Sequence, residues 1–579
     1  MTDTIPAKIF SVAAKQPQAV ALEDKIGDTY LGLTYADLVE RVESCAAGLL
    51  DLGIKPGERV ALLSNNRSEW AIADLGIMKA GAVTVGLHTT FSPHLLKFVI
   101  NHSGAKAIVV AKQEQLNKLL LILNEVPDLK TIIFIDPDHN DLEDWEGKHF
   151  VNWDDFLAQK KEGSEELPDI QTNPDDVATI VYTSGTTGEP KGVSLTHKNI
   201  LSNVDAATKA VPIHSTDSFL SFLPLSHVLE RTTGYYVPLI KGAKISYAES
   251  VKTLADNLKE VKPTILISVP RIFERIHDGL WEKLKAGSPL KRKIFVWALR
   301  QQPGTFGYKV GDALVFKKVR AKFGGRFRLT ISGGASLNAK LAKFFEKLGI
   351  QIYEGYGLTE TAPVLTANRE GARKFGTVGQ ALDGVEVKLA EDKEIIARGD
   401  NVMPGYHDDQ ASTNAMIDSE GWLHTGDQGH IDEDGFLTIV GRKKELIVTS
   451  TGKNVWPASL EVELNDDRYI NQSLIIGHDR KYLVALLVPD WQEVKRYCKE
   501  KKLAYYDPEE LAKRPEIIEL FKDRVDTIGR RRPEHERVVS FTLLVDEFTS
   551  ERDELTPTLK PRREIIKNNY AKEIEGMYS

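Results

Sequence analysis

The side chains best suited to hold a phosphate gather in residues 178–192, which read ATIVYTSGTTGEPKG. The apolar run at 178–182 predicts a buried strand that leads directly into a turn rich in glycine and threonine. Glycine lets backbone N–H groups approach an anion closely, and hydroxyl groups add donors. Lys191 can neutralise a phosphate as a point charge. The combination predicts a phosphate-binding turn, with a generic glycine-rich surface loop as the alternative; a Walker A loop is excluded because its GxxxxGK spacing is absent.

Two later segments carry side chains that suit the rest of a nucleotide. Residues 356–360, YGLTE, place an aromatic ring, a hydroxyl and a carboxylate on one turn. Asp427 lies in the turn-like segment HTGDQG, where its carboxylate can accept hydrogen bonds from both hydroxyls of a ribose, and Arg442 lies beyond the next predicted strand. Taken alone, Glu360, Asp427 and Arg442 are better explained as solvated surface charges.

Together and in this order, these segments resemble the adenylate-forming enzymes, a family that includes acyl-CoA synthetases, luciferases and the adenylation domains of peptide synthetases. Residues 182–192 are similar to the phosphate loop of that family. The further matches are SGGA at 332–335, YGLTE at 356–360, TGD at 425–427, GRKK at 441–444 and TPTLK at 556–560. LPLSHVLER at 223–231 and LTPTLK at 555–560 resemble the long-chain fatty-acyl-CoA synthetase branch. The resemblance covers nearly the whole chain.

The resemblance implies a site for ATP and Mg²⁺. It implies that Tyr356 stacks on adenine, that Asp427 and Arg442 hold the ribose, and that Glu360 and Thr183 hold Mg²⁺, a hard cation that favours oxygen ligands. The residues implied in catalysis are Lys191, Thr186, Glu360 and Lys560. The full ATP and AMP site implied in this way comprises Thr183, Ser184, Gly185, Thr186, Thr187, Gly188, Lys191, Gly334, Ala335, Glu354, Gly355, Tyr356, Gly357, Thr359, Asp427, Arg442, Lys444 and Lys560.

By the same resemblance, two lysines near the C-terminus serve two half-reactions. Lys560 is similar to the lysine that bridges the substrate carboxylate and the α-phosphate, although Leu559 stands where many members have glycine. Lys444 falls at the hinge about which the small domain rotates, and hinges absorb backbone change at a few residues. In the second step the thiol of coenzyme A attacks the acyl carbonyl, so Lys560 must leave the space that the pantetheine arm needs.

His227 and Tyr236 resemble the residues at the entrance of an acyl pocket. His227 precedes an apolar and aromatic run that includes Tyr235, Tyr236 and Val237. A lone histidine is as often structural as functional, so a packing role is the alternative. We assign His227 no general-base role, because a carboxylate nucleophile is already ionised at neutral pH.

The elements that must position these residues follow an α/β pattern. Short apolar strands alternate with helical patterns, which predicts parallel sheets covered on both faces. Thr34 and Asp37 are typical of a capping box at the start of a helix, and residues 60–63 are typical of a buried strand. We expect a large N-terminal domain of doubly wound sheets at 1–440 with a β-rich subdomain at about 375–440, a hinge at 441–446, and a small mobile α+β domain at 447–579.

Composition excludes several classes of protein. The chain has 579 residues, a net charge of −8 and two cysteines. The charge argues against a nucleic-acid-binding protein, and the cysteine count excludes a disulfide framework. We expect a cytoplasmic protein, because no secretory leader and no apolar run long enough to span a bilayer is visible.

One segment departs from this acidic balance. Residues 282–328 contain thirteen Lys or Arg and only two acidic residues, with Trp281, Phe295, Trp297 and Phe306 interleaved. Such a segment either binds the anionic inner face of a membrane peripherally or is a solvated helical surface.

The sequence thus predicts an ATP-dependent ligase that joins a fatty acid of long chain to coenzyme A through an acyl adenylate, with ATP, coenzyme A and Mg²⁺ as co-substrates and cofactor. The alternatives are an acyl-AMP ligase that loads a carrier protein, a coenzyme A ligase for another hydrophobic acid, and a non-catalytic acyl or nucleotide binder. Lys191, Glu360, Asp427, Arg442 and Lys560 argue against the last. The sequence indicates neither the acyl chain length nor the oligomeric state.

Overall fold

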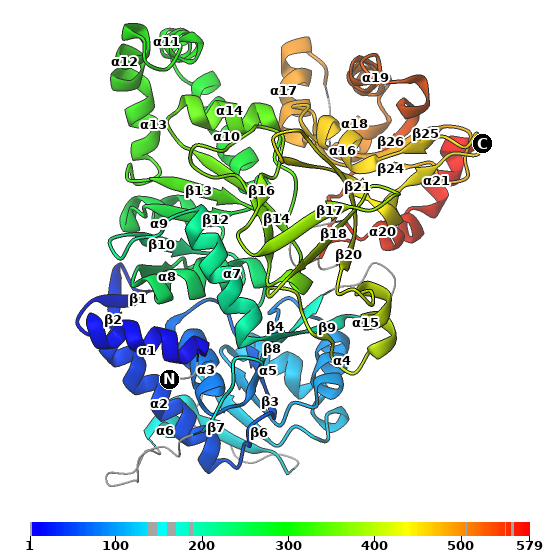
Figure 1. The fold of residues 1–579 in the computed structure, drawn as a ribbon. Helices are drawn as coiled ribbons and strands as arrows, with labels where there is room; N and C mark the ends of the chain where they lie inside the picture. The colour runs from blue at the N-terminus through cyan, green and yellow to red at the C-terminus, as the bar shows by residue number, and fades with distance from the viewer. Residues whose placement is uncertain are drawn as a thin grey trace.

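The computed structural model describes residues 3–136, 147–158, 170–183, 189–504, 507–549, 552–556 and 561–579. In Figure 1 the N-terminal residues form the lower body, and the C-terminal residues lie at the upper right. The predicted α/β architecture, with a large N-terminal and a small C-terminal domain, is confirmed.

The first sheet carries the strand that leads into the phosphate turn. Its order is β19 (Gly405–Tyr406), β9 (Lys191–Thr196), β8 (Val177–Thr183), β4 (Val83–Leu87), β3 (Arg59–Leu63), β5 (Ala107–Val110), β6 (Thr131–Phe134) and β7 (His149–Asn152). Strands β8 to β7 in this order run parallel, and β9 pairs with β8 antiparallel.

Side chains alternate between the two faces of this sheet, because successive residues of a strand point to opposite sides. Val60 and Leu62 pack against α1 (Ile5–Lys15), α2 (Tyr35–Asp51) and α3 (Ser68–Lys79). Ala61 and Leu63 pack on the other side with α4 (Pro93–Ser103) and α5 (Gln113–Leu120). Helix α6 (Trp153–Ala158) packs on α2. The predicted capping box of Thr34 and Asp37 begins α2.

The second sheet is built the same way. Its order is β16 (Gln380–Ala381), β15 (Val364–Ala367), β14 (Ile352–Gly357), β13 (Leu329–Ser332), β12 (Ile265–Ser268), β10 (Ser218–Ser221), β11 (Lys244–Tyr247), β1 (Val20–Ile26) and β2 (Thr29–Thr34). Phe219 and Ile265 pack with α7 (His197–Ala210), whereas Leu220 and Leu266 pack with α9 (Leu254–Val261) on the opposite face.

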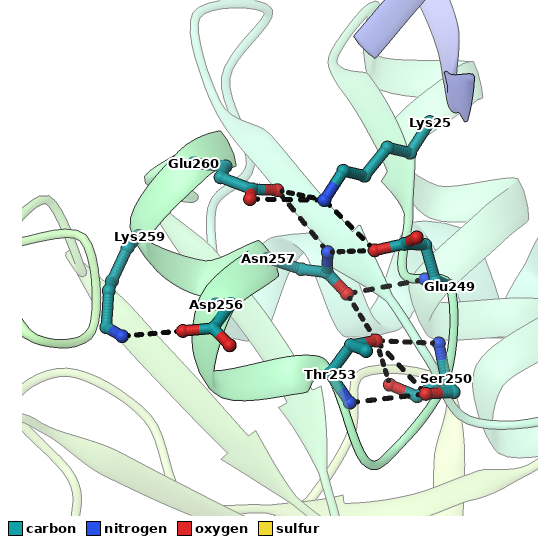
Figure 2. A network of polar contacts seen from close by, with 8 residues as sticks. All are labelled: Lys25, Glu249, Ser250, Thr253, Asp256, Asn257, Lys259 and Glu260. Atoms are coloured by element: carbon teal, nitrogen blue, oxygen red, sulfur yellow. Dashed lines mark hydrogen bonds and ion pairs between the residues drawn. The ribbon is translucent and has the colours of Figure 1, made fainter. Parts of the chain in front are cut away.

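A polar network links β1 to the loop after β11 and to α9 (Figure 2). Lys25 Nζ in β1 lies 3.0 Å from Glu249 and 2.9 Å from Glu260, and its side chain is 10% exposed. Asn257 donates to Glu249 and thereby holds the loop after β11 against α9. Two carboxylates raise the pKa of Lys25, so the ammonium stays charged.

Residues 385–442 form the antiparallel sheet expected for the β-rich region. Its order is β17 (Val385–Leu389), β18 (Glu394–Gly399), β20 (Leu423–Ile431) and β21 (Leu437–Arg442). Strand β21 ends at Arg442, and a turn of 3₁₀ helix at Lys443–Glu445 follows. Helix α15 (Gln410–Met416) lies between β19 and β20 in the chain.

The C-terminal residues have a core of their own around β24 (Ile470–Ile476), β25 (Leu483–Pro489) and β26 (Val538–Leu543). One face packs on α16 (Pro457–Asn465), α17 (Trp491–Lys501), α18 (Pro508–Lys513) and α19 (Pro515–Gly529). The other face packs on α20 (Arg563–Asn569) and α21 (Ala571–Tyr578). A short ribbon of β22 (Ile447–Val448) and β23 (Asn454–Val455) precedes this core.

The basic segment is helical. It covers the end of α10 (Pro270–Ala286), then α11 (Pro289–Arg300), α12 (Phe306–Gly311), a π-helical stretch at Asp312–Phe316 and α13 (Lys317–Ala321). In Figure 1, α11 and α12 lie at the outer end of the molecule. Its basic neighbours in the sequence suggested that Phe295 is exposed, but Phe295 is only 1% exposed. It packs in a core with Phe273 of α10 and Phe345 of α14 (Ala339–Lys347).

Candidate active site

A cavity of about 1350 Å³ collects most of the residues that the sequence indicated. Its wall includes residues from both large sheets, from the antiparallel sheet and from the C-terminal residues. The predicted site residues in this wall are Thr183, Lys191, His227, Gly334, Glu354, Gly355, Tyr356, Gly357, Thr359, Glu360, Arg442 and Lys444. Segments far apart in the sequence therefore meet at one hollow.

The β8–β9 hairpin brings the two ends of the predicted phosphate turn together. Thr183 and Lys191 are directly paired across the hairpin. Ser184, Gly185, Thr186, Thr187 and Gly188, which join them, lie outside the described residues. The structure thus places both flanks of the turn in the cavity wall.

A chain of contacts connects Lys191 with Glu360. Lys191 Nζ donates to Ser412 Oγ at 2.5 Å and lies 5.0 Å from the centre of the Tyr406 ring. The Tyr406 hydroxyl donates to Glu360 Oε1 at 2.8 Å. Sequence reasoning missed Ser412 and Tyr406, because neither lies in one of the recognisable motifs. Lys191 and Glu360 therefore lie in the same part of the cavity wall, and Tyr406 contacts both.

Asp427 is clamped between two of the predicted nucleotide residues. Its Oδ2 accepts from the Tyr356 hydroxyl at 2.7 Å, and its Oδ1 lies 3.0 Å from Arg442 Nε. The β20–β21 register pairs Asp427 with Arg442 directly. Burial, followed by the nearby Asp427 charge, raises the pKa of Tyr356 well above its usual value, so the phenol keeps its proton.

The carboxylate of Asp427 stands behind the wall and does not line it. Asp427 is 4% exposed, whereas Tyr356 and Arg442, its two partners, are in the cavity lining. Ala335 also falls outside the lining, next to Gly334. Gly357 admits no side chain, because an added Cβ would meet the Pro363 carbonyl oxygen at 1.7 Å.

Glu394 holds the turn that carries Asp427, although it lies in no recognisable motif. Glu394 Oε1 accepts from the backbone N–H of Gly426 at 2.8 Å, and Oε2 accepts from Lys443 at 3.0 Å. The Glu394 carboxylate also lies 3.2 Å from His424 Nδ1. Burial acts to raise the pKa of Glu394, but its bonds to Lys443, Gly426 and His424 outweigh burial and lower it. Glu394 therefore stays ionised and ties the turn to the 3₁₀ turn that begins at Lys443.

Of the two lysines assigned to the half-reactions, only Lys444 is among the described residues. Lys444 is in the cavity wall. Lys560 lies outside the described residues, as do residues 557–559. Thr556 and Pro561, which flank this segment, are both in the wall, and Leu555 and Pro561 form a β-bridge.

The acyl-pocket entrance needs one correction. His227 lines the cavity, with its Nδ1 accepting from the backbone N–H of Leu229 at 3.3 Å. Tyr236, in contrast, is not in the cavity wall and is 0% exposed. Its hydroxyl donates to Asp74 at 2.8 Å, because the helix turns this side chain into the core. An aromatic run in the sequence does not reveal which ring faces the cavity.

Comparison with known proteins identifies the family. Residues 9–407 match the AMP-binding enzyme family, and residues 444–579 match the AMP-binding enzyme C-terminal domain. The chain belongs to the AMP-binding enzyme family. The first match covers more than two thirds of the chain, so the adenylate-forming resemblance of the motifs is confirmed.

Two relatives within the family match along their length. A long-chain-fatty-acid–CoA ligase of Mycobacterium bovis is 33% identical over 597 residues, which cover 100% of this chain and 97% of that protein. A long-chain-fatty-acid–[acyl-carrier-protein] ligase of Arabidopsis thaliana is 30% identical over 641 residues, which cover 98% of this chain and 86% of that protein.

A solved structure has the same overall fold as this chain. The adenylation domain of a carboxylate reductase from Mycobacterium chelonae superposes with a TM-score of 0.82 at 20% identity. The match covers 99% of this chain and 91% of that one. In the part of the chain that the structure describes, no helix is both long enough and apolar enough to cross a membrane.

Glu354 provides a pH test of the cavity wall. Burial raises the pKa of Glu354 from 4.5 to about 7. The folded protein therefore holds a proton that the unfolded chain releases between these values, so ionisation of Glu354 destabilises the fold as pH rises. We expect Glu354→Gln, which carries no charge at any pH, to gain stability relative to the wild type between pH 5 and pH 8, by up to about 3 kcal/mol.

Urea unfolding at both pH values measures this difference. Glu391→Gln, at an exposed position, is the matched control and should show the same small effect at both. A difference between Glu354→Gln and wild type that does not change with pH would contradict the assignment of a buried, protonated carboxyl.

Proposed function

We propose that the protein ligates a fatty acid to coenzyme A in an ATP-dependent reaction that passes through an acyl adenylate and releases AMP and pyrophosphate. The observation that carries the proposal is that one cavity is lined both by the polar set of Tyr356, Arg442 and Lys191 and by a group of apolar residues, here called the apolar arm. A nucleotide and a hydrophobic acid can thus occupy one continuous space.

The apolar arm lies between α7 and the second sheet. Its aliphatic and aromatic residues are Ala207, Val211, Ile213, Phe219, Leu229, Ile331 and Val364. Burial of each methylene contributes about 0.8 kcal/mol, so an alkyl chain gains affinity with length until the arm is full. The fatty-acid specificity of the Mycobacterium bovis relative agrees with such an arm.

We assign each polar side chain of the cavity wall a role in binding ATP. Tyr356 presents its ring to adenine. Asp427 and Arg442 exchange part of their mutual contact for the ribose hydroxyls. Lys191 and the backbone of the turn at 184–188 hold the phosphates. These assignments follow from the family motifs, and the placement of Tyr356, Arg442 and Lys191 in one wall supports them.

The donor set suits Mg²⁺ only in company with ATP. Among the described residues, no three His, Cys, Asp or Glu side chains are grouped to hold a metal ion. Mg²⁺ is usually bound by one or two carboxylates together with substrate phosphates, so Glu360 and Thr183 are a sufficient protein contribution. The Tyr406 bond to Glu360 orients this carboxylate. When bound there, the ion would neutralise charge on the phosphates.

The chemistry has two steps. First, the carboxylate oxygen attacks the α-phosphorus, and the bond to pyrophosphate breaks. Lys560 and Lys191 offset the negative charge that builds up when two anions meet. Second, the coenzyme A thiolate attacks the acyl carbonyl, and AMP leaves. We propose that the domain at 447–579 rotates about 441–446 between the steps, with Lys444 at the pivot, and that Lys560 acts only in the first.

The overall reaction is tested by AMP formation with acids of roughly 2 to 18 carbons, in the presence of coenzyme A. We expect turnover to rise with chain length, and Glu360→Gln to reduce pyrophosphate release by about 100-fold or more. Exposed Glu391→Gln should behave as wild type. Near-normal pyrophosphate release by Glu360→Gln contradicts the metal role. Acyl transfer to a carrier protein in place of coenzyme A would favour the activity named for the Arabidopsis relative.

The two-step assignment predicts that the half-reactions separate. Lys560→Ala should lose acyl-AMP formation but still convert supplied acyl-AMP and coenzyme A into the thioester. Lys444→Pro should form acyl-AMP and accumulate it, because proline fixes φ near −65° and resists hinge rotation. Circular dichroism and thermal melting identify a folding defect, which would depress both steps in both variants. Equal loss of both steps in folded Lys560→Ala contradicts the two-geometry mechanism.

We also propose that α11 and α12 bind an anionic membrane surface from which the fatty acid is drawn. Lys291, Arg292 and Lys293 are all exposed at the start of α11. Leu290 is 65% exposed, Trp297 41% and Phe306 82%. Basic residues at such a surface contribute about 1 kcal/mol each, and exposed apolar side chains can insert between lipids.

Charge reversal tests this surface. We expect the Lys291→Glu, Arg292→Glu, Lys293→Glu triple variant to lose co-sedimentation with phosphatidylserine vesicles while its turnover of a short acid in solution is unchanged. Raising the salt should weaken wild-type binding, because the Debye length falls. Reversal of the exposed Lys499, Lys501 and Lys502 in the C-terminal domain is the matched control. Unchanged co-sedimentation of the first variant would identify a solvated helical surface.

A further inference from the structure

A fully buried charge network lies behind the wall of the cavity and is used by no step above. Arg231 is 1% exposed and pairs with Asp74, which is 0% exposed. Arg231 Nε donates to the Tyr236 hydroxyl at 2.8 Å, and that hydroxyl donates to Asp74 Oδ2 at 2.8 Å. The three groups form a closed ring of hydrogen bonds. Because Arg231 and Asp74 are charged, these bonds are stronger than hydrogen bonds between neutral groups.

The network joins β8, α3 and the helix that carries Arg231. Arg231 also donates from its second nitrogen to Thr179 Oγ1 at 2.6 Å, and Thr179 belongs to β8, the strand that ends at Thr183. Asp74 comes from α3, and the guanidinium lies 5.2 Å from the centre of the Trp70 ring on the same helix. One guanidinium therefore connects the phosphate-turn strand with α3 and with its own helix.

That helix has unusual geometry where it contributes to the cavity. Residues Glu230–Tyr236 form a π-helix, which continues into α8 (Val237–Lys241). A π-helix closes its turn over five residues, which is the separation of Arg231 and Tyr236. The turn places these two side chains together on the core side, while Leu229, Thr233 and Val237 of the same stretch line the cavity.

Burying an ion pair is costly unless all its groups are satisfied, so its retention calls for a role. A network that only stabilised the fold would not need to link the acyl wall with the phosphate strand. We propose that Asp74, Arg231 and Tyr236 are positioning residues: they hold the helix that lines the acyl arm at a fixed distance from β8, so that the acid carboxylate meets the α-phosphate in line. This inference rests on the proposed reaction.

Two adjacent tyrosines provide a matched test. Tyr235→Phe and Tyr236→Phe each remove one hydroxyl from a side chain that is 0% exposed. The Tyr235 hydroxyl donates to the carbonyl of Ala71 at 3.2 Å, outside the network. Both variants should lose similar thermal stability. Only Tyr236→Phe should raise the KM for the fatty acid, by about 10-fold or ~1.4 kcal/mol of binding free energy, because a shift of this helix displaces Leu229, Thr233 and Val237 in the cavity wall. The KM for ATP should change by less than about 2-fold, because the Tyr236 hydroxyl bonds to Arg231 and Asp74 and not to β8, which Arg231 still reaches through Thr179.

A second set of variants separates positioning from mere folding. Asp74→Asn keeps the shape of the side chain, and the Asp74→Asn, Tyr236→Phe double variant should raise the fatty-acid KM no further than Asp74→Asn alone, because the ring acts as a unit. The inference is overturned if the KM for ATP rises as much as the KM for the fatty acid. It is also overturned if Tyr235→Phe raises the fatty-acid KM as much as Tyr236→Phe does. The wild-type assay reports the proposed reaction itself; if the wild type activates a different carboxylic acid, the same KM comparison is made with that acid.

Discussion

The ion pair between Asp427 and Arg442 connects the three parts on which the site depends. Asp427 lies in β20, Arg442 ends β21, and the Tyr356 hydroxyl that completes the contact comes from β14 of the second sheet. Because Arg442 is also the last residue before the 3₁₀ turn at Lys443–Glu445, the same contact fixes where the chain departs toward the C-terminal domain. The contact therefore ties the part of the cavity wall formed by Tyr356 to the start of this connection.

Several other charged side chains near the cavity are also buried. A buried charge is tolerated only when fixed donors or an opposite charge satisfy it. Glu394 receives a backbone N–H and a lysine, Asp74 receives a guanidinium and a phenol, and each arrangement uses residues from at least two elements. The polar groups near the cavity are therefore preorganised before any substrate arrives, which is the condition for strong stabilisation of developing charge.

Sequence patterns predicted the local structure well, because local rules dictate it. The capping box at Thr34 and the buried strand at residues 60–63 each depend on residues within one element. Predictions about the direction of a side chain were less successful. Phe295 and Tyr236 both read as exposed or cavity-facing aromatics, and both are buried, because helix phase and tertiary packing decide which face a ring occupies. Ser412 meets Lys191 across 221 residues, a contact that no local pattern encodes.

The π-helix at Glu230–Tyr236 has a consequence for the changes of length that this helix can accept. Loss of one residue inside the turn would bring Arg231 and the tyrosine to a separation of four, which an ordinary α-helical turn also closes, so the buried bond could survive the deletion. A π-turn thus absorbs one extra residue within itself, so the part of the helix before the turn and the part after it keep nearly the same relative orientation with or without that residue. Leu229 and Val237 could then still line the same cavity after the deletion. The same deletion in an ordinary α-helix would rotate the two parts by about 100°, so this turn tolerates a change of length that an ordinary α-helical turn would not.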